Sequence, residues 1–236
     1  MSHFLIILKE KERKAEGFTF ISYILYNIQM SHFLKDFIKE VFLFCYFLHM
    51  REKKKKIIII GKAASGKDFL QRQLVLKGYI PLKQYTTRPK RPNESGDEYH
   101  FVTEEEFDSI IHKLKSVQNF VGWKYGYDID EALISDVMIF SPANYFDIIN
   151  AKDDKSKKLI EQSVIVYLDV GEDVRRERLS NRYVGGYEDD PLERRIRADD
   201  EDFKFFDNID WSDNQDKYIR LCDEEDIDEF LKKLFS

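Results

Sequence analysis

The chain of 236 residues contains 43% hydrophobic residues, which suits one domain of ordinary size, or one domain with an appendage, and is ample for a core. Its formal net charge of -6 argues against a general nucleic-acid binder, and locally concentrated basic residues suit a small anionic ligand better than DNA. The two cysteines, Cys45 and Cys222, are too few and too far apart for a disulfide framework or a zinc site, so we expect a reducing, cytoplasmic location.

Residues 1–50 differ in texture from the rest and are rich in Phe, Ile, Leu and Tyr, with the pentapeptide Met-Ser-His-Phe-Leu at 1–5 and again at 30–34. The longest apolar stretch, Val41–Leu48, is too short to span a bilayer, so we expect no stable membrane insertion, and no secretory signal is visible. Three interpretations remain: a helix packed on the domain, an interfacial or partner-binding helix, or upstream sequence translated from an early start codon ahead of Met50. We favour the last or the first, with the domain proper at 51–236.

A buried strand is predicted at Ile57–Ile60, and a glycine-bounded loop follows it directly. We call this loop, residues 61–68, the phosphate loop; its members are Gly61, Lys62, Ala63, Ala64, Ser65, Gly66, Lys67 and Asp68. Such a loop curls its backbone N–H groups around a β-phosphate, the next helix presents its positive end, and the lysine reaches the β- and γ-oxygens. Apolar residues at helical spacing continue to Leu76, which favours an ATP site over an ordinary turn with an exposed lysine.

Asp68 stands where a Ser or Thr hydroxyl usually coordinates magnesium in such a loop. A carboxylate is also a hard oxygen ligand, and Mg²⁺ keeps several of its waters when it binds protein. We therefore predict that Asp68 binds Mg²⁺ directly or through a water.

Downstream signals predict strands that alternate with helices. Gly78 closes the first helix, and a capping box of Thr103 and Glu106 opens a helix that is expected to reach about Leu114. The remaining expected strands are Tyr99–Val102, Val137–Phe140, Val164–Leu168 and, more weakly, Tyr218–Leu221; the remaining expected helices follow the two apolar strands and include Glu172–Leu179, Pro191–Phe205 and Ile227–Phe235. Continuous apolar runs of this kind occupy parallel sheets, so the fold class is α/β with right-handed crossovers.

A second anion-binding pattern lies in residues 86–102, where Arg88 and Arg91 can fork onto a monophosphate and Tyr99 can add a hydroxyl donor. Taken alone, these arginines would be explained by a solvated charged loop. The run Thr86-Thr87-Arg88, then Pro and Arg91, Glu94, Gly96 and Tyr99-His100-Phe101-Val102 resembles the guanylate kinase family over about residues 56–205, and is similar to its shorter, phage-like or virus-like members, in which a Gly-Lys-Asp loop also occurs.

The resemblance implies a P-loop NTPase three-layer fold with a parallel sheet, an insertion at 86–131 that binds a nucleoside monophosphate (NMP), and a lid at 181–193. It also implies that Arg88, Arg91, Tyr99 and Tyr125 bind the acceptor phosphate. We call these four residues the acceptor cluster.

The base-reading positions depart from the family pattern. Gln84 replaces a serine, Gln118 replaces a glutamate, and Ser141-Pro142-Ala143 replaces an acidic pair. Gln118 is taken as a substrate-binding residue, although it can equally be a surface residue of a loop. A carboxylate accepts the N1–H and N2–H groups of guanine well, whereas an amide can pair with several bases, so the acceptor base is open.

Arginines crowd the helices that flank the predicted lid, and by family position Arg178, Arg182 and Arg195 are expected to act with Lys67 in catalysis. Phosphoryl transfer needs positioning, a metal and converging cations rather than a covalent nucleophile. Arg175, Arg176, Arg194 and Arg197 are expected to be solvated or paired with Glu172, Glu177, Glu193 and Asp199.

These features predict a monomeric or homodimeric NMP kinase that uses Mg²⁺ and ATP to phosphorylate GMP, dGMP or a related NMP. Two alternatives are a kinase of another phosphorylated small molecule, such as a phosphosugar, and a catalytically inactive guanylate kinase-like binding module. A generic ATPase would have no use for the acceptor cluster.

Overall fold

The computed structural model describes residues 54–91, 94–120, 122–184, 192–208 and 217–235, and the side chains of 182–184 are outside that description. The N-terminal extension, Cys45 and most of the predicted lid therefore lie outside the described residues. Among the described helices, none combines the length and the apolar character needed to cross a bilayer.

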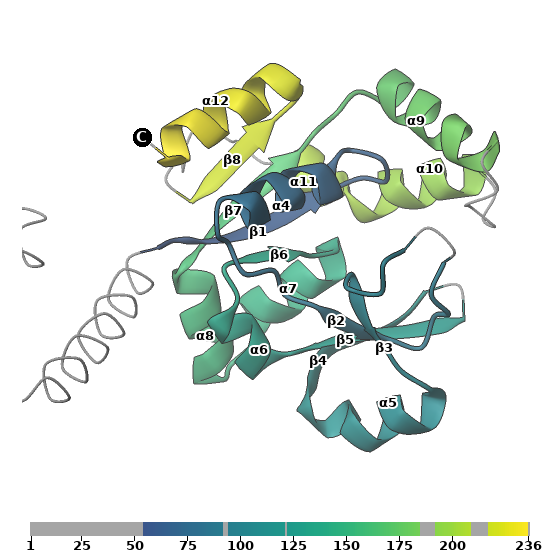
Figure 1. Ribbon diagram of the computed structural model, residues 1–236, viewed down its shortest axis with the longest axis vertical. Helices are drawn as coiled ribbons and strands as arrows, with labels where there is room; N and C mark the ends of the chain where they lie inside the picture. Colours follow the sequence, from purple (N-terminus) through teal and green to yellow (C-terminus); the bar gives the residue numbers. More distant parts are fainter. Residues whose placement is uncertain (1–53, 92–93, 121, 185–191, 209–216, 236) are drawn as a thin grey trace, which may run out of the picture. The chain divides into compact units, whose positions relative to one another are not determined.

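A four-stranded parallel sheet forms the centre of the described domain (Figure 1). Its order is β6 (Val137–Ile139), β1 (Lys56–Gly61), β7 (Ser163–Leu168) and β8 (Tyr218–Leu221). These are the strands that were predicted at 137–140, 57–60, 164–168 and 218–221. Every residue of β1 and β7 is buried, because helices cover both faces of the sheet.

The side chains of β1 alternate between two cores. Ile57 and Ile59 pack with α4 (Lys67–Leu76) and α12 (Glu224–Phe235) on one face. Ile58 and Ile60 pack on the other face with residues of α6 (Ile129–Ile134), α7 (Pro142–Asn150), α8 (Asp154–Glu161) and α11 (Lys204–Asp207). The predicted three-layer α/β fold is confirmed, and Figure 1 shows α4 and α12 on one side of the sheet and α6, α7 and α8 on the other.

A second sheet has the order β3 (Tyr99–Phe101), β2 (Gln84–Thr86), β5 (Trp123–Asp128) and β4 (Leu114–Phe120). The capping box of Thr103 and Glu106 is confirmed, with both of its hydrogen bonds present. The expectation that this helix reaches Leu114 is wrong, because α5 (Glu104–Ile110) passes into a 3₁₀ turn and Leu114 begins β4. Leu114 is buried opposite Asp128, and this antiparallel pairing continues to Phe120 and Trp123.

The arginine-rich helices also differ from their predicted bounds. Helix α9 (Glu172–Val184) runs beyond the expected end at Leu179, whereas the single helix expected from Pro191 to Phe205 is divided into α10 (Leu192–Asp202) and α11. The break falls at Phe203, where Phe203 and Phe206 are both buried against Tyr167. Packing of these rings therefore decides the bounds, which helical periodicity alone did not reveal.

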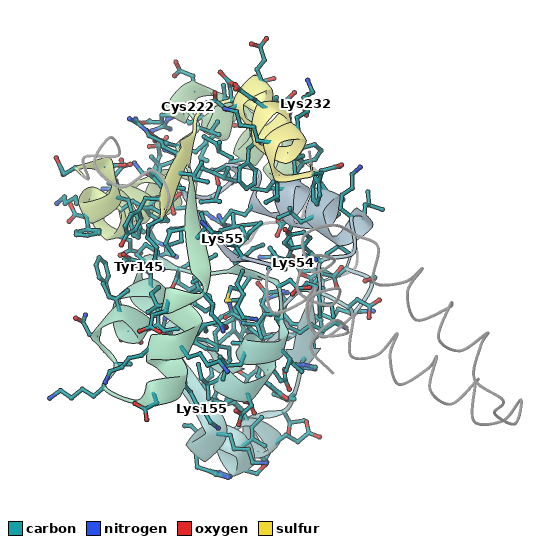
Figure 2. The ribbon with its side chains drawn as sticks, turned by 90° about the vertical axis from the view of Figure 1, so that its left-hand side faces the viewer. Lys54, Lys55, Tyr145, Lys155, Cys222 and Lys232 are labelled. Carbon is teal, nitrogen blue, oxygen red and sulfur yellow. The ribbon has the colours of Figure 1, made fainter. Side chains whose placement is uncertain are left out.

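The lysine run at 53–56 leads into β1, and its last member, Lys56, is the first residue of that strand. Lys56 is buried, and its ammonium donates to the carbonyl oxygens of Leu133 and Ser135 at 2.8 and 2.6 Å. It thereby satisfies carbonyl groups at the end of α6, which have no partner within the helix. Figure 2 shows Lys54 and Lys55 just before the sheet, Tyr145 on the α7 side and Cys222, an exposed free thiol, after β8.

Asp153 caps α8, and its removal tests how this helix is held. Its carboxylate accepts hydrogen bonds from Lys115 and from the Ser156 backbone and hydroxyl, which together lower the pKa of Asp153 to about 2. We expect Asp153→Ala to reduce the free energy of unfolding by about 1 kcal/mol at neutral pH. Because the folded-state pKa is depressed, this contribution is present above the unfolded pKa and is lost as pH falls towards the folded value.

Urea unfolding of Asp153→Ala and of the control Asp154→Ala, at neutral and at acidic pH, measures this contribution. The difference between Asp153→Ala and the wild type should shrink as the pH is lowered. An equal loss in the control variant, or a loss that does not depend on pH, would contradict the assignment.

Candidate nucleotide-binding site

The phosphate loop follows β1 at the carboxyl edge of the parallel sheet, where α/β proteins bind ligands. Gly66 has φ +99°, a left-handed conformation that favours glycine, and a Cβ on Gly61 would come within 2.5 Å of Ser65 Oγ and 3.0 Å of Leu168 O. The Lys67 ammonium donates to the Gly61 and Lys62 carbonyl oxygens at 2.7 and 2.9 Å. The loop is thus curled as predicted, with its lysine folded back across it.

Side chains of the loop are held by its surroundings. Ala63 and Ala64 pack with Leu179 of α9 and Ile196 of α10 in a small buried cluster. Ser65 Oγ is buried and has no hydrogen-bond partner among the described residues. The Lys62 ammonium lies 3.0 Å from Asp207 and 3.4 Å from Asp200. The arginine-rich helices therefore form one wall of the phosphate loop (Figure 1).

Two of the three arginines that were expected to act in catalysis lie near this wall. Arg178 Nη1 donates to the Ala64 carbonyl at 3.2 Å, and its Nη2 lies 3.4 Å from Glu224. Arg195 lies within electrostatic reach of Asp199, which itself contacts the loop. Arg182 is in α9, but its side chain lies outside the described residues.

Arg175 was expected to be either solvated or paired, and in the structure it is paired. Arg175 is 2% exposed, and its Nη1 lies 3.3 Å from Asp199 Oδ2 while its Nε donates to the Val170 carbonyl at 3.2 Å. Arg176 is paired with Glu172 and Glu193 at 2.6 Å each. The Arg197 Nε donates to the Glu193 carbonyl, which is a local helix contact.

In the acceptor cluster, Arg88, Tyr99 and Tyr125 are close together. The Arg88 guanidinium lies 5.5 Å from the centres of the Tyr99 and Phe101 rings, and the Tyr99 and Tyr125 rings meet edge to face with centroids 6.1 Å apart. Strand alternation explains the grouping, because Tyr125 lies opposite Thr86 on β2 while Tyr99 lies opposite Gln84. The cluster therefore forms on one face of the second sheet.

Glu94 organises this cluster, and its role was missed from the sequence. Its carboxylate accepts from Arg88 Nη2 at 2.7 Å and Nη1 at 3.1 Å, and from the Arg91 backbone N–H at 2.8 Å. Burial works against the charged form, but the contacts to Glu94 raise the pKa of Arg88. Glu94 is part of the run that resembles the guanylate kinase family, and its spacing of three from Arg91 and six from Arg88 was the available signal.

Tyr99 of the acceptor cluster is protonated at neutral pH. Burial, followed by the neighbouring Tyr125 and Asp68, raises the pKa of Tyr99 to about 12. Its hydroxyl therefore keeps its proton and can donate a hydrogen bond to a phosphate oxygen.

The chain is similar to proteins of a known family. The family model for guanylate kinase matches residues 53–131. A guanylate kinase from Malacoplasma penetrans (strain HF-2) is 30% identical over 133 residues, which cover 49% of this chain and 68% of that protein. The chain belongs to the guanylate kinase family.

This member of the guanylate kinase family is also similar to two longer proteins and to a solved structure. MAGUK p55 subfamily member 4 of Rattus norvegicus and of Mus musculus are 30% and 31% identical over 91 and 88 residues, or 35% and 34% of this chain. The chain spans only 20% and 13% of the length of these two relatives. The crystal structure of guanylate kinase from Anaplasma phagocytophilum matches with a TM-score of 0.50 and 17% identity, covers 78% of this chain and 86% of its own, and supports the fold.

The positions that departed from the guanylate kinase pattern lie together in the structure. Ser141 Oγ donates to Gln118 Oε1 at 3.2 Å, and Gln118 Nε2 donates to Ser116 Oγ at 2.8 Å. Ser116 in turn donates to Asp147 of α7 at 2.6 Å. Gln118 is thus not a loop residue but a member of β4, linked to the N-cap of α7. Gln84 donates to the Ile139 carbonyl at 2.7 Å, at the end of β6.

The residues present fit a magnesium ion bound together with a nucleotide. Asp68 is exposed at the end of the phosphate loop, and Mg²⁺ in phosphoryl-transfer sites needs only one or two carboxylates because substrate phosphates and waters complete its shell. Among the described residues no group of three or more His, Cys, Asp or Glu side chains could hold a metal alone. This family member is therefore suited to metal that arrives with its nucleotide.

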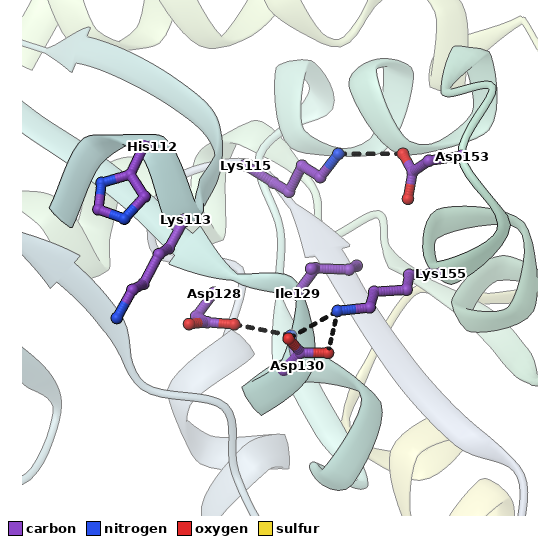
Figure 3. A pocket seen from close by; sticks show the side chains of 8 residues that line it. All are labelled: His112, Lys113, Lys115, Asp128, Ile129, Asp130, Asp153 and Lys155. Carbon is purple, nitrogen blue, oxygen red and sulfur yellow. Dashed lines mark hydrogen bonds and ion pairs between the residues drawn. The ribbon is translucent and has the colours of Figure 1, made fainter.

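A concavity of about 500 Å³ lies away from these residues, between the start of β4 and the first turns of α6 and α8 (Figure 3). Its lining is mostly charged, and two of its lysines are paired: Lys115 with Asp153 at 3.0 Å and Lys155 with Asp130 at 2.7 Å. None of the predicted site residues lines it. It therefore adds no group to the nucleotide site.

Proposed function

We propose that the protein is an NMP kinase that transfers the γ-phosphate of ATP to an NMP. The observation that carries this proposal is the presence of two separate groups of cationic side chains: Lys67, folded back across the curled phosphate loop, and Arg88, held by Glu94 at 5.5 Å from the centre of the Tyr99 ring. This arrangement suits a donor site and a second phosphate site, and a simple ATPase does not need the second.

On the donor side, the backbone of the phosphate loop holds the β-phosphate and Lys67 carries its charge to the β- and γ-oxygens. Arg178, Arg182 and Arg195 supply further positive charge to the transferred group, whose oxygens carry the charge of the transition state. Bound Mg²⁺, held by Asp68 and the phosphates, would neutralise the same charge.

On the acceptor side, Arg88 and Arg91 bind the monophosphate while Tyr99 and Tyr125 donate hydroxyl hydrogen bonds. The contacts of Arg88 to Pro89 and Glu94 use three of its five N–H donors among the described residues, so donors remain for phosphate oxygens. The pair with Glu94, with side chains only 10% and 13% exposed, fixes the guanidinium before the acceptor arrives. Such preorganisation reduces the ordering cost of binding.

A coupled kinase assay of the full chain with Mg-ATP and a panel of GMP, dGMP and the other NMPs and dNMPs tests the proposal. We expect phosphorylation of at least one of them. The proposal fails if a folded protein, verified by circular dichroism, phosphorylates none of the panel.

The uncharged hydrogen bonds around Gln118 bear on the choice of acceptor. GMP and dGMP are the acceptors that the family suggests, but Gln118 and Ser141 offer amide and hydroxyl groups where the family pattern has acids. We expect Gln118→Glu to raise kcat/KM for GMP relative to the other monophosphates by about tenfold or more, because a carboxylate accepts both N1–H and N2–H of guanine.

Asn119→Asp is the matched control for Gln118→Glu, because it adds the same charge at the next position of β4, where the side chain is exposed. It should leave the ratio between acceptors unchanged. Equal ratios in both variants would remove Gln118 from base recognition.

The same uncharged contacts favour a second candidate, a kinase of another phosphorylated small molecule such as a phosphosugar, which needs no base-reading acid. Adding phosphosugars to the assay panel separates the two candidates. A catalytically inactive binding module is the third alternative, and it predicts no measurable affinity for Mg-ATP in isothermal titration calorimetry.

A further inference from the structure

Asp199 of α10 makes a direct contact with the backbone of the phosphate loop. Its Oδ2 accepts the Ala63 N–H at an N···O distance of 2.7 Å, which is a charge-assisted hydrogen bond of the short kind. Ala63 and Asp199 are 136 residues apart in the chain. The contact therefore joins the loop to a helix of the arginine-rich region.

A carboxylate beside a phosphate site repels the ligand, so its position needs a counter-charge. Arg175 provides one, because its Nη1 lies 3.3 Å from the same oxygen and its side chain is 2% exposed. Lys67 and Arg195 also act on Asp199 electrostatically. Asp199 is thus held between a buried arginine and a loop amide, and three positive charges limit its repulsion of phosphate.

The neighbouring contacts show that the loop and α10 are fixed to each other at more than one place. Lys62 bridges to Asp200 and Asp207, and Ala63 and Ala64 pack against Ile196. Among these contacts, the hydrogen bond of Asp199 is the one made to a backbone N–H of the loop itself. The direction of that N–H determines the path of the loop between Lys62 and Ala64.

We propose that Asp199 is a positioning residue: by holding the Ala63 amide, with Arg175 as its buried partner, it fixes the shape of the phosphate loop for Mg-ATP. This inference rests on the proposed function, in which the phosphate loop binds Mg-ATP. Asp199 does not touch the reacting atoms, and its effect passes through the loop. The affinity for the donor nucleotide then depends on the position of α10.

Three variants test this role: Asp199→Ala, which removes the acceptor oxygen; Asp199→Asn, which keeps an oxygen for the Ala63 amide; and Asp202→Asn, a control at an exposed position of the same helix. The first readout is hydrogen exchange of the phosphate-loop amides in protein without nucleotide. The second is the KM for Mg-ATP compared with the KM for the acceptor. A double variant, Arg175→Met with Asp199→Ala, replaces the single Asp199→Ala variant if an unpaired Arg175 prevents folding.

We expect Asp199→Ala to speed exchange at Ala63 and to raise the KM for Mg-ATP by about tenfold or more, as for the loss of a hydrogen bond to a charged group. The KM for the acceptor should stay at the wild-type value, and Asp199→Asn should recover much of both losses. A role in stability alone would leave the ratio of the two KM values unchanged.

Exchange at Ala63 that is the same in Asp199→Ala and Asp202→Asn overturns the inference, as does an equal change in both KM values. A wild-type chain that phosphorylates no acceptor overturns the proposed function instead. The exchange measurement needs no nucleotide, so it decides whether Asp199 positions the loop in that case too.

Discussion

Replacing Lys67 with methionine should lower kcat for phosphoryl transfer by about 10²–10³, the loss expected when one preorganised donor to the transition state is removed. Methionine keeps the apolar stem and removes the ammonium, which in the structure donates to the Gly61 and Lys62 carbonyls. Because the ammonium serves the γ-phosphate most strongly as charge develops, kcat should fall more than the KM for Mg-ATP rises. Steady-state kinetics with the acceptor at saturation measure both.

The matched control is Lys157→Met, which removes an exposed lysine of α8 that is distant from the phosphate loop in the sequence. It should have wild-type kinetics, and thermal unfolding of both variants separates lost chemistry from lost folding. A Lys67→Met enzyme with wild-type kcat would mean that the loop binds no γ-phosphate.

Local sequence was sufficient to predict the phosphate loop. Its strand, its two glycines and its helix are consecutive, so β-branched residues, left-handed backbone and helical spacing each act within a few residues. The same holds for the capping box of Thr103 and Glu106. The parallel sheet was also predictable, because a continuous apolar run such as Val164–Leu168 suits a strand covered on both faces.

The second sheet was harder to predict because its hairpin carries a weak signal. Strand β4 is mostly half-buried or exposed and includes Lys115 and Asn119, so its polar residues follow no clean alternation. A register shift between Lys115 and Gln118, with Ser116 at φ +50°, disturbs the period further. Tyr99 and Tyr125 were nevertheless assigned to one cluster by family resemblance, and the structure shows them in ring contact.

Contacts between distant residues account for most of what the sequence did not reveal. Asp199 was considered only as a partner of a nearby arginine, since no local pattern relates it to Ala63. The link from Gln118 to Ser141 likewise depends on how β4 meets the start of α7. In each pair the two residues are far apart in the sequence, and only the folded chain brings them within hydrogen-bond distance.

Arg175→Met should cause a larger loss of stability than the substitution of an arginine at the surface. It leaves Asp199, whose side chain is 16% exposed, without its buried partner, and breaking a buried pair in this way costs about 3–5 kcal/mol. For a domain of this size, that corresponds to a fall in Tm of roughly 6–20 °C. Differential scanning calorimetry and urea unfolding measure the two quantities.

Arg176→Met is the control, because the neighbouring Arg176 pairs with Glu172 and Glu193 at the surface, where such pairs contribute little to stability. The pH dependence separates the two cases further. Burial already raises the pKa of Asp199, so the folded state binds its proton more tightly than the unfolded state does. That proton stabilises the folded chain at low pH, and the stabilisation is lost as pH rises through the folded pKa. Without Arg175 the pKa of Asp199 rises further, so the deficit of Arg175→Met should be larger at alkaline than at acidic pH. A deficit that is equal at all pH values, or equal to that of Arg176→Met, would show that Arg175 does not balance the charge of Asp199 beside the phosphate loop.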